Sequence, residues 1–441
     1  MSPVKPVSEG KQQMPGPDYV LPQGQGKDKI IAPSQMSAKW RAEYGSIYRV
    51  WNGTWPEIVL TDPKDVEAWF SGKGEHIKFS YDPSGALFNY VMGHAVGLIN
   101  GQDWKILRKL LDPYVNFLNS ARLTPMVLQR AIEHVQILPT QSLAPTKEGR
   151  TIVNTYRAMQ PYPFFIQMEI FYGLLTDAQK DELWSLGQIF LTLSTWTVEQ
   201  GFTRSRILKY MYSWDSWKLI RGFDRRWRTL NRSIVQQKAT EIDLPSSCGR
   251  ASETSIFANL DVMTSVITGC ILHIAENKRI QKKLQQEIDN HKDTLADYVK
   301  RQDTFMHWCF LESIWLEPIP AFSLAGRCSG DKILGGYHIP ANTSVIIDAH
   351  AINIYNPYWG PDTKIYRPER FDGLNLRDMK YNLSTFGYGS RKCLGVHLGG
   401  KMVRSILAAL FGSTLLGGVP LILPRIKRDE WSRQIKATLG E

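Results

Sequence analysis

Regular alternation of apolar and polar positions begins at residues 47–51, after 40 residues that are polar and rich in Pro, Gly, Gln and Lys. A second β-rich run at 57–60 follows across the polar triplet Asn52-Gly53-Thr54, and this spacing predicts a β-hairpin. Asp62-Pro63 then offers an N-cap and a proline at the first helical position. We therefore expect a helix directly after the hairpin.

Helical patterns dominate the rest of the chain. Residues 150–240 have the pattern of helices rich in aromatic and basic side chains, and residues 255–288 form one continuous helical pattern. Short β-like runs return at 336–340 and 345–348. Together these patterns predict a mainly α protein with a small β portion, an α+β fold class.

Composition agrees with one large folded domain. The chain has 441 residues, of which 43% are apolar and 11% are aromatic, so it has the material for a large apolar interior. No internal repeat and no interdomain linker interrupts the pattern. We expect residues 1–40 to form a polar tail and residues 41–441 to form a single domain.

Charge and cysteine content restrict the possible partners. The net charge of +11 suits nucleic acid, an anionic membrane or an acidic redox partner, but no nucleic-acid motif accompanies it, so no nucleic-acid partner is expected. The five cysteines are odd in number and lack a C-x-x-C pair, which argues against a disulfide framework or a structural zinc site and favours a reducing compartment. The sequence contains no run of about 18 apolar residues of the kind that spans a membrane.

The densest group of candidate functional residues is the stretch FGYGSRKCLG at 386–395. A thiolate at Cys393 would be a metal ligand, and the glycines of this stretch let the backbone fold closely around the sulfur and direct N–H groups at it. Phe386 would shield the sulfur from water, and Arg391 offers a fork of donors that suits a carboxylate. The alternative is a turn that holds an ordinary buried cysteine.

The spacing F-x-x-G-x-R-x-C-x-G resembles the haem-binding signature of the cytochrome P450 family. The resemblance implies one haem-enclosing domain, with haem b bound to Cys393 through its iron and Arg391 on a haem propionate. A second element at 101–113 places Trp104 and Arg108 four positions apart and resembles the W-x-x-x-R element of the family. Both side chains would then meet a propionate, whereas a surface arginine beside a core tryptophan is the alternative.

The run Ala258-Asn259-Leu260-Asp261 resembles the family's distal helix, which crosses the haem face opposite the cysteine. The family follows its acid with a threonine that helps deliver protons for oxygen activation, but here Val262 stands in that place. We expect Asp261 to be the carboxylate of a proton relay, and Thr264, on nearly the same helix face, to supply the missing hydroxyl through a water. The alternatives are a structural hydrogen bond at Asp261 and a polar group of the substrate in place of Thr264.

A second departure concerns the family's E-x-x-R motif. Glu312 matches the motif, but Trp315 replaces its arginine, and Arg370 belongs to a P-E-R-F motif that joins the same buried charge network in the family. We expect Glu312 and Arg370 to pair without the third member and Trp315 to weaken the scaffold behind the cysteine loop.

The resemblance, which is closest to filamentous-fungal members that serve secondary metabolism, implies a monooxygenase. It would take NADPH electrons from a separate reductase and insert one oxygen atom of dioxygen into a small organic substrate. Two alternatives remain: oxidative coupling or ring formation without oxygen insertion, and a degenerate haem binder of low activity. The departures at Val262 and Trp315 keep both alternatives open.

Location depends on a segment that this sequence does not contain. Eukaryotic members of the family usually begin with a membrane helix and a proline-rich hinge, and Met14-Pro15-Gly16-Pro17 resembles such a hinge. We expect the cytoplasmic face of the endoplasmic reticulum membrane if a native anchor is missing here, and the cytoplasm otherwise. The basic, aromatic surface also predicts peripheral membrane contact.

Overall fold

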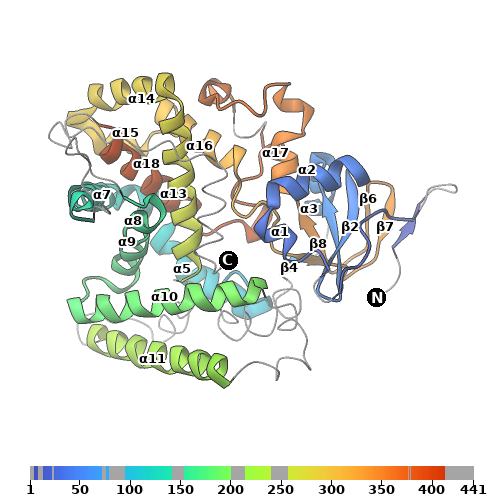
Figure 1. Ribbon diagram of the computed structural model, residues 1–441, viewed down its shortest axis with the longest axis horizontal. Coiled ribbons are helices and arrows are strands. Elements are labelled where there is room, and N and C mark those ends of the chain that lie inside the picture. Colours follow the sequence, from blue (N-terminus) through green and yellow to red (C-terminus); the bar gives the residue numbers. More distant parts are fainter. Residues whose placement is uncertain are drawn as a thin grey trace.

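The computed structural model describes residues 4–7, 13–21, 24–71, 76–78, 95–141, 153–199, 214–239, 257–375, 377 and 379–412. Within these ranges a smaller region of strands and short helices lies beside a larger helical region (Figure 1). Small sheets in a mainly helical molecule confirm the predicted fold class.

The strands lie in two sheets. A mixed sheet has the order β2-β3-β8-β5-β4, and a small antiparallel sheet has the order β1-β7-β6. The strands are β1 (Lys5–Pro6), β2 (Ile47–Asn52), β3 (Trp55–Leu60), β4 (His76–Lys78), β5 (Gly326–Cys328), β6 (Lys332–Leu334), β7 (Tyr337–Ile339) and β8 (Val345–Ile347).

The predicted hairpin is present, and its register explains how the mixed sheet forms. β2 pairs antiparallel with β3, and β3 then pairs in parallel with β8, so that Ile58 stands opposite Val345. After the hairpin, the Asp62 side chain accepts a hydrogen bond from the Lys64 N–H at 2.8 Å and caps α3 (Pro63–Phe70), as predicted.

Two helices precede the hairpin, α1 (Asp28–Ile31) and α2 (Pro33–Tyr44). The boundary predicted between residues 40 and 41 therefore falls inside α2. Ser37 and Trp40 are buried on this helix, because Trp40 packs against Tyr48 and Phe322. The end of the predicted polar tail is thus a packed part of the fold.

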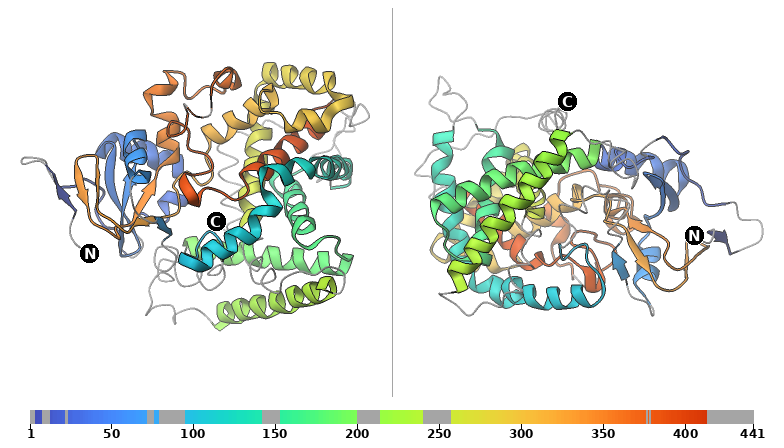
Figure 2. Two further views of the ribbon diagram at one scale, coloured as in Figure 1. Left: turned by 180° about the vertical axis from the view of Figure 1, so that it is seen from behind. Right: turned by 90° about the horizontal axis from the view of Figure 1, so that it is seen from below.

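The later helices form the larger region, in which α10 and α11 run alongside each other (Figure 2). They are α5 (Gly101–Val115), α6 (Phe117–Arg122), α7 (Thr124–Ile137), α8 (Thr155–Met159), α9 (Pro161–Tyr172), α10 (Asp177–Glu199), α11 (Trp214–Ala239), α13 (Ala258–Glu276), α14 (Lys278–Asn290), α15 (Leu295–Lys300), α16 (Phe305–Leu316) and α18 (Val396–Phe411). A further helix, α17 (Ala349–Ile354), contacts both α16 and α2.

The structure corrects the continuous helix predicted for residues 255–288. The helix ends at Glu276, Asn277 adopts a non-helical backbone, and α14 begins at Lys278. Asn277 caps the break, since its side-chain amide donates to the His273 carbonyl at 2.7 Å. Residues 255 and 256 lie outside the described residues.

The largest apolar core lies where α7, α13, α16 and α18 meet. It contains side chains such as Val127, Ile267, Phe310 and Val403, each with no more than 2% of its surface exposed. Burying one such side chain stabilises the folded state by about 1.5–3 kcal/mol. Of the helices that the structure describes, none is long and apolar enough to cross a membrane.

Candidate active site

The Cys393 loop enters α18 and is shaped by glycines at left-handed positions. Gly387 has φ 74° and Gly389 has φ 66°, values that favour glycine. A Cβ atom at Gly389 would also lie 3.2 Å from a ring carbon of Phe70. The Cys393 N–H donates to the Phe386 carbonyl at 2.8 Å and closes the loop.

Cys393 differs from the other described cysteines in its accessibility. Solvent reaches its side chain, whereas Cys270, Cys309 and Cys328 are buried free thiols. The protein around the sulfur still raises the pKa of the Cys393 thiol by desolvation, and a hydrogen bond from the Gly395 backbone and the charge of Arg108 oppose that rise. The Gly395 backbone and the charge of Arg108 would therefore both stabilise a thiolate at Cys393.

Three residues that the sequence predicted as cofactor contacts lie together beside this loop. The Arg391 guanidinium lies 4.4 Å from the Trp104 ring centroid, and its Nη2 donates to the Ile99 carbonyl at 2.9 Å. The Arg108 Nη1 donates to the Lys392 carbonyl at 2.9 Å, so α5 is joined directly to the cysteine loop. Phe386 is half-buried and packs against Phe310, with ring centroids 6.4 Å apart.

Lys78 belongs to the same group of cations, although no sequence motif marks it. It ends β4, and its backbone exchanges hydrogen bonds with the Asn100 side chain at 2.7 and 2.8 Å. Desolvation, and then the charge of Arg391, lower the pKa of Lys78 to about 8. Two cations that disfavour each other's charge would be stabilised by an anion placed between them.

This donor set fits haem. One accessible thiol can bind iron, while Lys78, Arg108 and Arg391 can bind the two propionates. Asp112 lies next to this group, but it forms an ion pair with Arg108 at 3.2 Å. Lys78 and Arg391 are therefore the main positive charges available to bind a propionate carboxylate.

Asp261 and Thr264 both lie near the start of α13, in different surroundings. Asp261 is exposed and accepts a hydrogen bond from the Tyr156 hydroxyl of α8. Thr264 is fully buried, and its hydroxyl donates to the Leu260 carbonyl of its own helix at 2.6 Å. Their roles in proton delivery remain predictions. Tyr156 lies in no motif, so the sequence did not indicate it.

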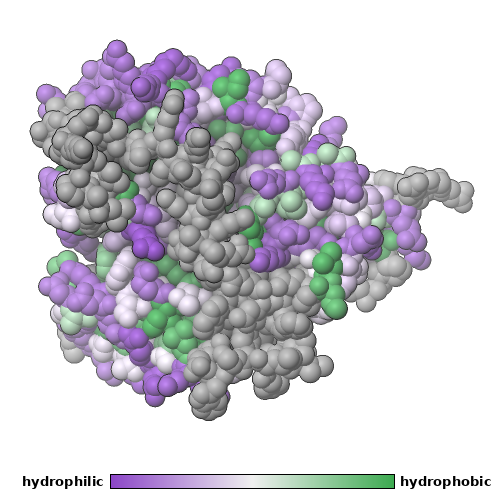
Figure 3. All heavy atoms as spheres, in the orientation of Figure 1, coloured by the Kyte–Doolittle hydropathy of each residue, from purple (hydrophilic) through white to green (hydrophobic). Residues whose placement is uncertain are grey.

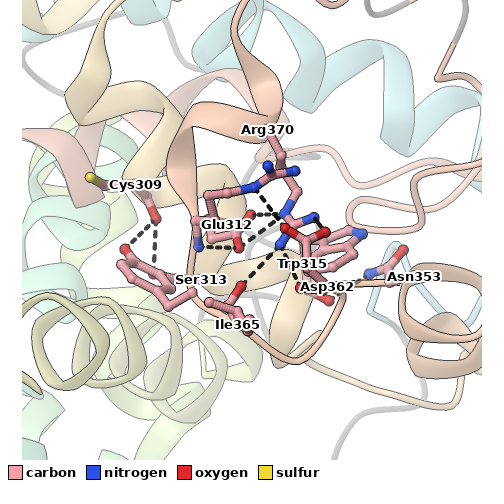
Figure 4. A network of polar contacts seen from close by, with 10 residues as sticks. Cys309, Glu312, Ser313, Trp315, Asn353, Asp362, Ile365 and Arg370 are labelled. Carbon is pink, nitrogen blue, oxygen red and sulfur yellow. Dashed lines mark hydrogen bonds and ion pairs between the residues drawn. The ribbon is translucent and has the colours of Figure 1, made fainter. Parts of the chain in front are cut away.

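The Glu312–Arg370 pair forms as predicted, and both side chains are buried (Figure 4). The Arg370 Nε donates to both Glu312 oxygens, at 2.8 and 3.1 Å, and Nη1 meets Asp362 at 3.2 Å. Desolvation raises the pKa of Glu312 to about 7, and the charge of Arg370 is the main opposing effect. Asp362 is therefore a second acidic partner of Arg370, and it lies outside both sequence motifs.

The structure shows what surrounds Trp315, and the expected weakening of the scaffold stays a prediction, since the indole Nε1 is buried without a hydrogen-bond partner among the described residues. Its side chain is fully buried, and the Arg370 guanidinium lies 4.4 Å from its ring centroid (Figure 4). The indole thus packs against the remaining arginine instead of leaving a gap. The Trp315 carbonyl also accepts from Asn353 at 2.9 Å, and Asn353 exchanges hydrogen bonds with Ser384 ahead of the cysteine loop.

Comparison with known proteins agrees with this geometry. The cytochrome P450 family profile matches residues 25–247 and 250–413. The chain is 36% identical to the cytochrome P450 monooxygenase hasH of Aspergillus fumigatus, over 94% of this chain and 82% of that protein. It is 33% identical to gliC of the same species (92% and 84%) and 32% identical to verC of Clonostachys rogersoniana (94% and 84%), both also cytochrome P450 monooxygenases.

The chain therefore belongs to the cytochrome P450 family. It is a cytochrome P450 monooxygenase, which confirms the predicted family and enzyme class. The similarity to proteins of filamentous fungi is confirmed as well.

Proposed function

We propose that this enzyme inserts one atom of oxygen from dioxygen into a small organic substrate in fungal secondary-metabolite biosynthesis. The observation that carries the proposal is the accessible Cys393 thiol in a glycine-shaped loop beside the cations of α5 and β4. Haem bound through such a thiolate supplies an electron-rich iron that favours cleavage of dioxygen. Relatives named as monooxygenases support the reaction class.

Each predicted site residue receives one task in this proposal. Cys393 binds the iron, and Phe386 is the sequence-based choice to shield the sulfur from water once haem is bound. Trp104, Arg108 and Arg391 hold the propionates, together with Lys78. Asp261 is the acid that supplies protons, and Thr264 is the sequence-based choice for the hydroxyl that assists it.

The test is turnover of the haem-loaded enzyme with NADPH, a P450 reductase and labelled dioxygen. A substrate can be found by screening small molecules for the absorption change that follows displacement of water from haem iron. One labelled oxygen atom in the product is the expected result. A product without label would favour coupling or ring formation, and an enzyme that consumes no oxygen would favour a degenerate haem binder.

We further propose that the reductase docks on the face formed by α5, α6 and the cysteine loop. Lys105 and Lys392 are exposed there, and the neighbouring Phe117 and Leu118 are 55% and 73% exposed. Cations around an apolar centre suit an acidic electron donor. Lys105→Glu should raise the reductase concentration needed for half-maximal turnover, whereas Lys278→Glu on α14 should not.

Peripheral membrane contact is also proposed. On the face shown in Figure 3 the described surface is mainly hydrophilic, and apolar side chains form small separate groups. Tyr19, Val20 and Leu21 make one exposed apolar stretch, 38%, 60% and 81% accessible. Flotation with anionic liposomes at low salt should show binding that Leu21→Asp weakens. Attachment to the cytoplasmic face of the endoplasmic reticulum remains our proposal for location.

A further inference from the structure

The hydroxyl expected to assist Asp261 is already engaged elsewhere. Thr264 has no exposed surface, and its hydroxyl donates to the Leu260 carbonyl at 2.6 Å. To donate a hydrogen bond toward Asp261, this hydroxyl would have to give up its buried bond to Leu260, at a cost of about 1–3 kcal/mol. Val262, in the place of the family's threonine, has no hydroxyl to offer.

A different hydroxyl is already in contact with the carboxylate. The Tyr156 hydroxyl of α8 donates to the Asp261 Oδ1 of α13. Two contacts fix α8 in place: Asn154 caps it by accepting from the Arg157 N–H at 3.0 Å, and the Ala158 carbonyl bonds to the His134 ring at 2.8 Å. The phenol therefore approaches Asp261 from a rigid neighbouring helix.

The electrostatics of the pair keep the phenol a proton donor. Desolvation, and then the charge of Asp261, raise the pKa of Tyr156 far above its usual value, so the hydroxyl stays protonated at any physiological pH. Asp261 is exposed, so water reaches its carboxyl while the phenol stays neutral.

The polar contacts continue along the interface between the two helices. The Gln160 and Ser265 side chains also lie near Tyr156 and partly oppose the rise in its pKa. One turn beyond Ser265, the Thr268 hydroxyl is 1% exposed and has no protein partner among the described residues. Asp261, Ser265 and Thr268 share one face of α13 at helical spacing, and an unpaired hydroxyl in such a position suits a bound water.

We propose that Tyr156 is the positioning residue for Asp261 in proton delivery. The family uses an acid and a threonine on one helix for this step, and here a phenol and a carboxylate on two helices would replace them. The inference rests on the monooxygenase function proposed above. When Asp261 gives its proton to the reaction, the hydrogen bond from Tyr156 stabilises the carboxylate that remains. Water on the exposed side of Asp261 then returns the proton, and Tyr156 stays neutral throughout.

The test compares Tyr156→Phe with Tyr162→Phe in the haem-loaded enzyme. Both substitutions remove one phenol hydroxyl, but the Tyr162 hydroxyl donates to the Met402 carbonyl at 2.9 Å and does not meet Asp261. The first readout is the infrared carboxylate band assigned to Asp261 by its absence in Asp261→Asn. This band should shift in Tyr156→Phe and stay in place in Tyr162→Phe.

The second readout is the share of consumed oxygen that is released as hydrogen peroxide. Loss of a hydrogen bond to a charged group should raise this share by up to about tenfold in Tyr156→Phe. Asp261→Asn should raise it at least as much, and adding Tyr156→Phe to Asp261→Asn should raise it little further. Tyr162→Phe should release peroxide at the parent level.

Two results would overturn the inference: an unshifted Asp261 band in Tyr156→Phe, or coupled turnover in that variant while Thr264→Val uncouples. The second result would restore Thr264 as the assisting hydroxyl. A parent enzyme that consumes no oxygen would instead overturn the proposed function, and the infrared comparison separates the two failures because it requires no turnover.

Discussion

Cys393 is the only exposed cysteine among the described residues, so it can be compared directly with a buried cysteine. Cys393→Ala should abolish the red-shifted absorption band that a thiolate-bound haem gives with carbon monoxide after reduction. Cys309→Ala is the control, since Cys309 is fully buried on α16, where its carbonyl accepts from the Tyr366 hydroxyl at 3.0 Å. Retention of the band in Cys393→Ala would refute the ligand assignment.

Removing the charge of Lys78 should weaken haem binding but stabilise the haem-free protein. Lys78→Met keeps most of the aliphatic stem but removes the charge that faces Arg391. It should speed haem loss to apomyoglobin a few-fold, because a partly exposed ion pair contributes about 1 kcal/mol or less.

The same Lys78→Met substitution should raise the melting temperature of the haem-free protein, because it relieves the repulsion between two cations. Lys64→Met, at an exposed position of α3, should change neither quantity. Slower haem loss in Lys78→Met would argue against a propionate contact.

The sequence predicted those site residues that belong to a motif of fixed spacing. Trp104, Arg108 and Arg391 were expected together and do lie together. Lys78 and Tyr156 were missed for a physical reason: each meets its partner only after distant segments pack. Tyr156 is 105 positions from Asp261, and no local pattern records such a contact.

At the scale of elements, α16 and its neighbours give a prediction opposite to the one favoured by the sequence. Trp315→Arg restores the family residue, and on the motif alone it should stabilise the protein. In the structure it would replace a buried indole with a second guanidinium beside Arg370. We expect the melting temperature of the haem-bound protein to fall, because loss of the packed ring and burial of a charge together cost roughly 3 kcal/mol or more.

The comparison for Trp315→Arg is Trp308→Arg, a half-buried tryptophan on the same helix. That change should lower the melting temperature less, because the new side chain can reach water. Trp315→Phe, which keeps an aromatic face for Arg370, should lie between the parent and Trp315→Arg. A higher melting temperature for Trp315→Arg would show that Glu312 and Asp362 can bind two guanidinium groups.

Element boundaries were harder to predict than element types. The hairpin and its capped helix were predicted because turn and capping residues act locally. The break at Asn277 was missed because apolar positions continue across it. α13 is largely apolar, and α14 then places Ile280, Leu284 and Ile288 on one buried stripe, so the two patterns join without a gap.

At the scale of the whole molecule, Asp348 joins elements from both ends of the chain. Its carboxylate accepts from Ser37 on α2 at 3.0 Å, from Tyr48 on β2 at 3.5 Å and from the Ala351 N–H of α17 at 2.8 Å. Complete burial raises the pKa of Asp348 from 3.8 to about 7. The folded state therefore holds a proton that the unfolded state has released between these two values.

The sign of the pH effect follows from that difference. A raised folded-state pKa gives stability that is present below about pH 4 and is lost as pH rises toward 7. The unfolding free energy of the parent relative to Asp348→Asn should fall by up to about 1.4 kcal/mol per pH unit across this window and level off above it. Melting temperatures of the haem-bound proteins at a series of pH values measure the trend.

Asp303→Asn is the control for this pH series. Asp303 is exposed, and its ion pair with Arg301 lowers its pKa, so any effect falls below about pH 4. A parent-minus-Asp348→Asn difference that stays flat from pH 4 to 7 would mean that Asp348 is ionised inside the folded protein.

The parallel pairing of β3 with β8 also determines when the molecule can finish folding. Leu60 stands beside Ile347, so the hairpin leaves the ribosome long before the strand that covers its edge has been made. At 5–20 residues per second this interval is roughly 15–60 s. During this interval the uncovered edge of the hairpin is apolar, because it consists of Ile58, Val59 and Leu60. These residues are 2% exposed or less in the finished fold. Chaperones that hold nascent chains should therefore raise the soluble yield, and slower synthesis without them should lower it.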